Sequence, residues 1–205
     1  MLIADAVRRG NNNFDLLRLV AAAMVIVGHS YALVPVKGEI DPIQALVGFA
    51  YSGSLAVKFF FFLSGILVTN SLLQKQDIIE FVTMRTARVV PAIAVCSAIL
   101  ALIIGPIFTT DTKYFSNPDV FRFIWGNSII NIQYTLPGVF QNLAFKEVNA
   151  SLWTIPYEVC AYIVLAGFFL IGALKNKHVA AAICVFFIVY SLLPQGGDFF
   201  IFLQQ

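Results

Sequence analysis

Long apolar stretches separated by short polar segments dominate the sequence, and they predict a series of membrane-spanning helices. A helix needs about 20 apolar residues to cross the hydrocarbon core of a bilayer. The stretches that meet or approach this length are Phe14–Pro35, Leu46–Leu73, Val89–Phe108, Leu152–Leu174 and the shorter Val179–Pro194. A further apolar run, Phe199–Leu203, begins close to the end of the sequence. The pattern therefore predicts an all-α, polytopic bundle of about five to six transmembrane spans.

The segment between the third and fourth stretches is mixed in character. Val120–Leu136 combines aromatic residues with Arg122 and several asparagines, so we interpret it as interfacial or re-entrant. The sequence shows no internal repeat and no boundary of a second domain, which favours a single transmembrane domain over residues 1–205. Because the last apolar run has no partner helix before Gln205, we expect Gln205 to be a truncation point.

Composition supports the membrane assignment and excludes other classes. Apolar residues make up 60% of the chain, charged residues 12%, and the mean hydropathy is +0.85, which is outside the range of ordinary soluble domains. A net charge of +2 without a basic stripe gives no sign of nucleic-acid binding. Cys96, Cys160 and Cys184 lie in apolar runs without a nearby histidine at ligand spacing. They indicate neither a disulfide nor a metal site.

Positive charges in the loops predict the orientation of the chain, because cytoplasmic loops carry an excess of Lys and Arg. With a cytoplasmic N-terminus, the inside set is Arg8, Arg9, Arg18, Lys75, Arg85, Arg88, Lys175 and Lys177. The smaller outside set is Lys37, Lys113, Arg122 and Lys146. The polar start of the chain leads into a long apolar run without a clear cleavage site, which favours a retained first helix over a signal peptide. We therefore expect a protein of the cytoplasmic (inner) membrane whose N-terminus is cytoplasmic.

Two ionisable residues lie inside the first apolar stretch. Arg18 and His29 are eleven positions apart, so at ~100° per residue they point within roughly 20° of one another on a helix. They are about 16 Å apart along the helix axis, which is half the thickness of the hydrocarbon core. Alone, Arg18 would be interpreted as an anchor at a helix end and His29 as a satisfied core histidine. Together on one face they favour a functional interior, since ionisable residues at this depth are costly.

Further cationic residues accompany the second and third stretches. Lys58 precedes the aromatic run Phe59–Phe62, and its ammonium group at that depth needs a partner or a water-filled pocket. Arg85 and Arg88, at i and i+3, share one helix face just before Pro91. The pair is typical either of a positive-inside anchor or of two guanidinium groups that bind phosphate in a bidentate manner.

A carboxylate in the fourth stretch is expected at a depth similar to that of His29. Glu158 follows Trp153, which fits the aromatic belt of the outer boundary, and lies about 9 Å below that boundary. His29 lies roughly 10 Å below the same boundary if the core is ~30 Å thick. We therefore predict that Glu158 lies within about 8 Å of His29, where it would orient the imidazole for general-base chemistry. The alternative is an unrelated polar residue near a helix end.

Four of these segments, in this order, resemble the acyltransferase-3 superfamily of integral membrane acyltransferases. They are Phe14-Asp15-x-x-Arg18 through Gly28-His29-Ser30, Phe59–Gly65, Arg85-x-x-Arg88 with Pro91, and Ser151-Leu152-Trp153 through Glu158. The order of all four carries the resemblance rather than any single motif. The resemblance covers nearly the whole chain, but family members are typically about twice as long, so the chain corresponds to their N-terminal half.

The resemblance implies transfer of an acyl group, commonly acetyl from acetyl-CoA, to a hydroxyl of a carbohydrate or lipid-linked glycan of the cell envelope. By the motif match it ties activity to Arg18, His29, Arg85 and Arg88. The three arginines would then bind the phosphates of the acyl-CoA, and His29 would act as general base or as transient acyl carrier. Glu158 would orient His29, and Lys58 would stabilise developing negative charge. The expected partners are the lipid bilayer and the glycan acceptor, with no metal.

Two other classes of function compete with this interpretation. A transporter or channel fragment would need inverted repeats or paired broken spans, and the sequence shows neither. A truncated, non-catalytic remnant would insert into the membrane without catalysing a reaction. Binding of labelled acetyl-CoA to the purified protein would favour the acyltransferase over both.

Overall fold

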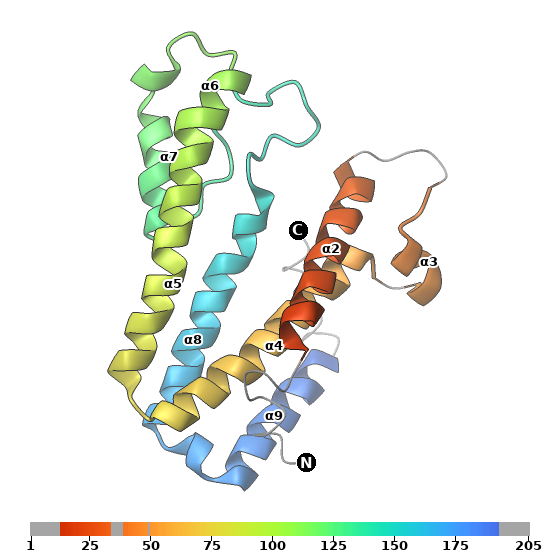
Figure 1. The fold of residues 1–205 in the computed structure, drawn as a ribbon, viewed down its shortest axis with the longest axis vertical. Coiled ribbons are helices and arrows are strands. Elements are labelled where there is room, and N and C mark those ends of the chain that lie inside the picture. Colours follow the sequence, from red (N-terminus) through yellow and green to blue (C-terminus); the bar gives the residue numbers. More distant parts are fainter. Residues whose placement is uncertain (1–12, 34–38, 49, 193–205) are drawn as a thin grey trace. The chain divides into compact units, whose positions relative to one another are not determined.

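The computed structural model describes residues 13–33, 39–48 and 50–192, and they form a series of helices (Figure 1). In the first half of the chain these are α2 (Phe14–Leu33), α3 (Pro42–Val47), α4 (Ser52–Lys75), α5 (Ile78–Ile99), the π-helix η1 (Leu100–Ile104) and α6 (Gly105–Phe108). In the second half they are η2 (Tyr114–Ser116), α7 (Pro118–Ser128), η3 (Ala150–Trp153), α8 (Thr154–Leu170), η4 (Ala173–Lys175) and α9 (Lys177–Leu192). The predicted all-α class is confirmed.

Four helical segments of the described residues are long and apolar enough to cross a membrane. They are Phe14–Tyr31, Ser52–Lys75, Ile78–Phe108 and Ala150–Leu170. They correspond to the first four predicted stretches, so the prediction of a polytopic membrane bundle is confirmed. The fifth stretch, Val179–Pro194, forms the shorter helix α9, and Pro194 and the run Phe199–Leu203 lie outside the described residues.

The predicted start of the third span at Val89 was wrong. The helix begins at Ile78, because the Asp77 side chain caps it by accepting hydrogen bonds from the backbone N–H groups of Ile79 at 2.8 Å and Glu80 at 3.0 Å. Pro91 therefore lies inside the helix rather than at its entrance. The charged residues on the first turns lower the hydropathy there, so only the uncharged remainder of the helix was recognised as a span from the sequence.

The predicted start of the second span at Leu46 was also wrong. Leu46 belongs to the short helix α3, which ends at Gly48 in the left-handed conformation with φ of 78°. A new helix, α4, begins at Ser52. Glycine closes α3 without strain because it has no Cβ.

The mixed segment Val120–Leu136 is helical only in its first part. The helix α7 has 11 residues, too few to cross a bilayer, and the chain after Ser128 continues without regular structure. Figure 1 shows α7 beside α5, and Val120 and Phe123 of α7 are buried against Ala101 of the π-helix. The interpretation of Val120–Leu136 as interfacial or re-entrant stays a prediction.

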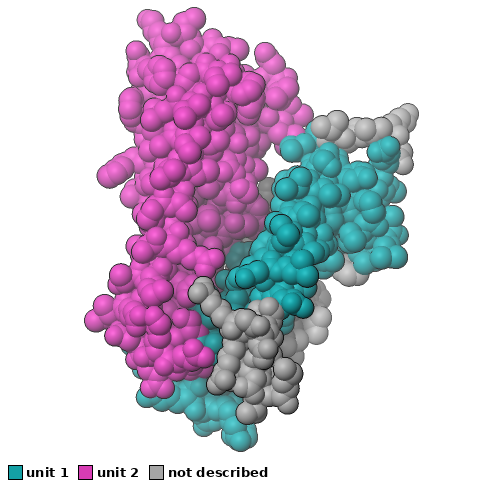
Figure 2. All heavy atoms as spheres, viewed as in Figure 1, with its two compact units in different colours: residues 1–70, 163–205 teal, residues 71–162 magenta. Residues whose placement is uncertain are grey.

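The chain divides into two compact units, coloured separately in Figure 2. Unit 1 comprises residues 1–70 and 163–205, and unit 2 comprises residues 71–162. The boundaries fall within α4 and α8, so each of these helices contributes to both units.

A π-helical turn shapes the core of unit 2. Pro106 has no N–H to donate to the carbonyl of Ala101 five residues earlier, and the Tyr114 hydroxyl donates to that oxygen instead at 2.8 Å. Gly105 makes this approach possible, because a Cβ at this position would lie 2.0 Å from the Tyr114 hydroxyl oxygen. The buried cluster around Tyr114 holds α7 and the segment leading to η3 against the π-helix η1.

A buried carboxylate organises the start of α4 in unit 1. Asp41 is 3% exposed and accepts hydrogen bonds from the backbone N–H groups of Ile43 at 2.9 Å, Gln44 at 3.1 Å and Ser52 at 3.1 Å, and from the Ser52 hydroxyl. Burial alone would favour the protonated acid, but the hydrogen bonds from Ser52, Gln44 and Ile43 together hold the pKa of Asp41 below its ordinary value. Asp41 therefore caps α3 and ties it to the first turn of α4.

Replacing Asp41 with asparagine should destabilise the protein by about 1–3 kcal/mol, because the three backbone N–H groups lose their charged acceptor and the amide nitrogen that replaces Oδ2 cannot accept from the Ser52 hydroxyl. The folded-state pKa lies below the unfolded value of about 3.9, so the stabilisation is present above that value and is lost as the pH falls through the folded-state pKa. Thermal unfolding in detergent at neutral and acidic pH measures both effects. Asp119→Asn, at an exposed position on α7, is the control and should melt like the unaltered protein. Equal melting of Asp41→Asn and Asp119→Asn would contradict the role of Asp41.

Candidate active site

His29 is a candidate acid–base group in unit 1. It is half-buried on α2, and its Nδ1 lies 2.7 Å from the carbonyl oxygen of Val25 one turn earlier. A carbonyl only accepts hydrogen bonds, so Nδ1 carries the proton and donates it. In the neutral ring, Nε2 then holds the lone pair. This geometry gives His29 a fixed orientation with Nε2 as the basic atom.

The helix that carries His29 is in close contact with α4 at the preceding residue. A Cβ added to Gly28 would lie 2.4 Å from the backbone nitrogen of Gly53 and 2.8 Å from the Ser52 hydroxyl oxygen. Only glycine allows α2 to approach the first turn of α4 this closely. Because Asp41 fixes Ser52, the contact holds the backbone next to His29 in place.

The two predicted cations of unit 1 have few partners. Arg18 lies on α2 with His29, and its Nη1 is 3.3 Å from Oδ1 of the fully exposed Asp15. Such a surface ion pair contributes little and leaves the guanidinium available for a ligand. Lys58 is exposed on α4 and has no hydrogen bond or ion pair with the described part of the chain.

In unit 2, the side chain of Arg85 lies between two aromatic rings. Its Cζ is 5.7 Å from the ring centre of Phe81, one turn earlier on α5, and 5.8 Å from the ring centre of Tyr162 on α8. The two rings meet edge to face, with centres 6.2 Å apart and an angle of 86° between their planes. Both contacts are within the range of cation–π attraction. Arg88, three residues later, is exposed.

Glu158 is bound by its own helix. The hydroxyl of Tyr162, one turn further along α8, donates a hydrogen bond to Oε1 of Glu158. Tyr162 thereby connects Glu158 to the ring pair around Arg85. The predicted pairing of Glu158 with His29 joins residues of the two units and stays a prediction.

Sequence reasoning missed Phe81, Tyr162 and Asp41 as candidate site residues. A signal existed for each, because Phe81 precedes Arg85 and Glu158 precedes Tyr162 by four positions, the spacing at which side chains on a helix meet. Asp41 stands directly before Pro42, and an acidic cap followed by proline is typical of a helix start.

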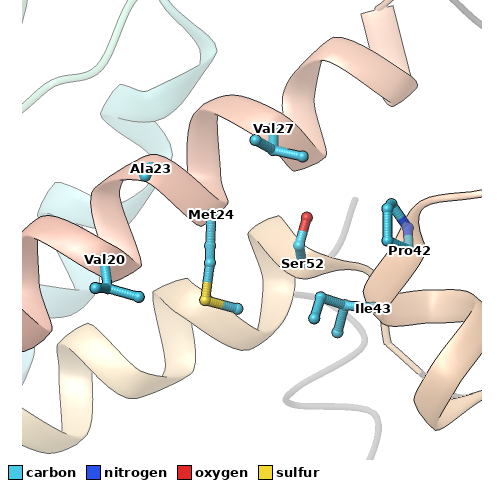
Figure 3. Close-up of a pocket in the computed structure, with 7 residues that line it drawn as sticks. All are labelled: Val20, Ala23, Met24, Val27, Pro42, Ile43 and Ser52. Atoms are coloured by element: carbon cyan, nitrogen blue, oxygen red, sulfur yellow. The ribbon is translucent and has the colours of Figure 1, made fainter.

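A hollow of about 260 Å³ lies in unit 1 between α2, α3 and α4 (Figure 3). It is lined by Val20, Ala23, Met24, Val27, Pro42, Ile43 and Ser52. At 100° per residue, the lining face of α2 is roughly opposite to the face of His29. The one hydroxyl in the lining, that of Ser52, donates to Asp41. The hollow therefore offers apolar contact rather than acid–base chemistry.

Membrane-length helices define a polytopic membrane protein, in which unit 1 carries the half-buried His29 and unit 2 carries Arg85, Arg88 and Glu158. A sequence profile of the acyltransferase-3 family, described as an acyltransferase domain, matches residues 11–204. The chain therefore belongs to this family, and the resemblance predicted from its motifs is confirmed.

Two curated relatives support the assignment. An O-acetyl transferase of Shigella phage Sf6 is 35% identical over 189 residues, which cover 92% of this chain and 54% of the relative. Nodulation protein 10 of Rhizobium leguminosarum bv. viciae is 31% identical over 163 residues, which cover 75% of this chain and 43% of the relative. The chain thus spans about half the length of these relatives. No solved structure matches it.

Proposed function

We propose that the chain is part of a membrane-bound O-acyltransferase that moves an acetyl group from acetyl-CoA to a hydroxyl of a cell-envelope glycan. The family membership and the O-acetyl transferase relative support the reaction class. The observation that carries the proposal is the orientation of His29, whose Nδ1 is occupied by the Val25 carbonyl so that Nε2 is the basic atom. A histidine held in one tautomer is suited to general-base catalysis.

The proposed reaction is a single acyl transfer. Nε2 of His29 accepts the proton of the acceptor hydroxyl while the hydroxyl oxygen attacks the thioester carbonyl carbon. The carbon–sulfur bond then breaks, the acetyl group stays on the acceptor oxygen, and the coenzyme A thiolate takes the proton back from the imidazolium. In a variant of this path, Nε2 itself attacks the thioester carbonyl carbon and the coenzyme A thiolate leaves. The acceptor hydroxyl oxygen then takes the acetyl group from Nε2, and the hydroxyl proton passes through the freed imidazole to the thiolate.

The other candidate residues bind charged groups of the donor or stabilise charge that develops in the transition state. Arg18, Arg85 and Arg88 bind the phosphates of the donor through forked N–H groups. Lys58 stabilises negative charge that develops on the thioester oxygen. Glu158, predicted at a depth similar to that of His29, stabilises the positive charge that His29 carries after it has accepted the proton, since the Nδ1 proton is already donated to the Val25 carbonyl.

A transfer assay tests the proposal. The protein is reconstituted in vesicles with envelope glycan acceptors, and acetyl-CoA with a radiolabelled acetyl group is added. Label that moves to the glycan supports the proposal, whereas label that crosses the membrane as free acetyl-CoA would favour a transporter. Absence of both transfer and coenzyme A binding would overturn it.

We further propose that the N-terminus faces the cytoplasm of the inner membrane. Gln76 follows α4 and Thr112 follows α6, and the segment between them includes the helical run Ile78–Phe108, about 46 Å long. In a variant without the native cysteines, Gln76→Cys should react with an impermeant maleimide only from the cytoplasm and Thr112→Cys only from outside. Reaction of both from one side would contradict the orientation.

A further inference from the structure

The environment of Arg85 differs from that of every other predicted cation of the site. Its Nε atom is buried and has no hydrogen-bond partner among the described residues. Buried donors without a partner are rare and call for a physical reason. The charge of the group is instead attracted by two aromatic rings, whose centres lie 5.7 and 5.8 Å from Cζ. Among the described residues, Arg85 is thus held by the attraction between its charge and the two rings rather than by a carboxylate.

The geometry of the two rings restricts where the guanidinium can lie. The ring centres and the Cζ of Arg85 form a nearly equilateral triangle with sides of 5.7, 5.8 and 6.2 Å. Because the rings are almost perpendicular, the cation lies in the corner that they form. Phe81 is 5% exposed, so its ring has no freedom to move away. A guanidinium fixed in this way loses little further entropy when a ligand binds.

The outer part of the Arg85 side chain remains free. No hydrogen bond or ion pair engages its terminal nitrogens within the part of the chain that the structure describes, and the residue is half-exposed. These two nitrogens are the fork that binds phosphate oxygens in pairs. The guanidinium is thus held between the two rings while its two terminal nitrogens have no partner in this part of the chain.

Glu158 acts on this arrangement through Tyr162. The Tyr162 hydroxyl donates to the Glu158 carboxylate, and a hydrogen bond to a charged acceptor is stronger than one between neutral groups. The bond holds the hydroxyl end of Tyr162 in place and draws its proton towards the carboxylate, which raises the electron density of the ring. A ring richer in electrons attracts the guanidinium more strongly.

We propose that Phe81 and Tyr162 are positioning residues that hold Arg85 with its terminal nitrogens free for the phosphates of the acyl donor, and that Glu158 strengthens this hold through Tyr162. The inference rests on the proposed donor-binding role of Arg85. It adds two aromatic residues to the site and gives Glu158 an action within unit 2.

Coenzyme A binding to the protein in lipid nanodiscs, measured by titration calorimetry, tests the positioning. Tyr162→Leu and Phe81→Leu should each raise the Kd by about three- to tenfold, the range expected for one cation–π contact. Tyr162→Phe keeps the ring and should restore most of the affinity. Tyr157→Leu is the matched control, because Tyr157 lies on the same helix but contacts Trp153, with ring centres 5.9 Å apart. It should leave the Kd unchanged.

A double variant separates positioning from general damage to the fold. In an Arg85→Ala background, Tyr162→Leu should not raise the Kd further, because the ring then has no guanidinium to hold. If Tyr162→Leu and Phe81→Leu bind coenzyme A as tightly as the unaltered protein, or weaken binding equally without Arg85, the inference is overturned.

A spectroscopic measurement distinguishes failure of the inference from failure of the proposed function. In the unaltered protein, the Nε proton of Arg85, identified by its loss in Arg85→Lys, should resonate upfield of that of the exposed Arg122 because of the aromatic ring currents. Tyr162→Leu should move it towards the Arg122 position. An upfield resonance without coenzyme A binding would uphold the positioning and reject the donor role of Arg85. An Arg85 resonance at the Arg122 position would reject the positioning itself.

Discussion

Replacing His29 with alanine is expected to lower the rate of acetyl transfer by about 10²–10⁴-fold, the usual loss when a proton-transfer group is removed. The affinity for coenzyme A should stay the same, because the proposed donor contacts are made by arginines. The effect follows from the orientation of the ring, in which Val25 occupies Nδ1 and Nε2 is the basic atom. Initial rates with radiolabelled acetyl-CoA, together with the Kd for coenzyme A, measure both quantities.

The chain provides its own control for this experiment. His178 is exposed at the start of α9, so His178→Ala should transfer acetyl groups at the unaltered rate. Both variants should insert into the membrane equally well, since one imidazole contributes little to the free energy of insertion of a bundle of apolar helices. Added imidazole should restore part of the activity of His29→Ala by replacing the missing base. Full activity of His29→Ala without imidazole would reject the catalytic role, whichever of the two proposed paths the reaction follows.

Much of the fold could be predicted because membrane-spanning helices are recognised by their lack of charged residues. The runs that became α2 and α8 contain few charges, and a length of about 20 apolar residues identifies such a helix without knowledge of its neighbours. The start of α5 was missed for the same reason. Glu80, Arg85 and Arg88 interrupt the hydropathy of its first turns, yet Asp77 caps the helix ahead of them. A cap is a local signal that hydropathy does not register.

Only the relations between candidate site residues on the same helix could be predicted from the sequence. That Arg18 and His29 lie on one continuous helix follows from their spacing, and α2 includes both. The contact between Arg85 and Tyr162 joins residues 77 positions apart, and it depends on how α5 packs against α8. Glu158 was predicted from depth alone, which cannot show that Tyr162 occupies one of its oxygens. Contacts between helices are set by packing, and the hydropathy pattern contains no information about it.

Replacing both Arg85 and Arg88 with alanine is expected to raise the KM for acetyl-CoA by about 10- to 100-fold and to change kcat much less. This rise corresponds to about 1.4–2.8 kcal/mol, the contribution of one charge-assisted hydrogen-bonding group, because the exposed Arg88 contributes little. Phosphate contacts are made in the ground state and in the transition state alike, so their loss weakens binding without slowing the chemical step. The expected result is therefore opposite in kind to that of His29→Ala.

The two arginines are expected to contribute unequally to this rise in KM. Arg85 is held between Phe81 and Tyr162, whereas Arg88 is exposed, so Arg85→Ala should account for most of the loss. Arg122→Ala is the control, because Arg122 is an exposed cation of the same unit and lies 3.9 Å from Asp119 on α7. It should leave both constants unchanged. A fall in kcat at unchanged KM would show instead that the pair stabilises the transition state. If Arg85→Ala and Arg122→Ala raised the KM equally, the effect would come from the total charge of the protein and not from a specific contact of Arg85.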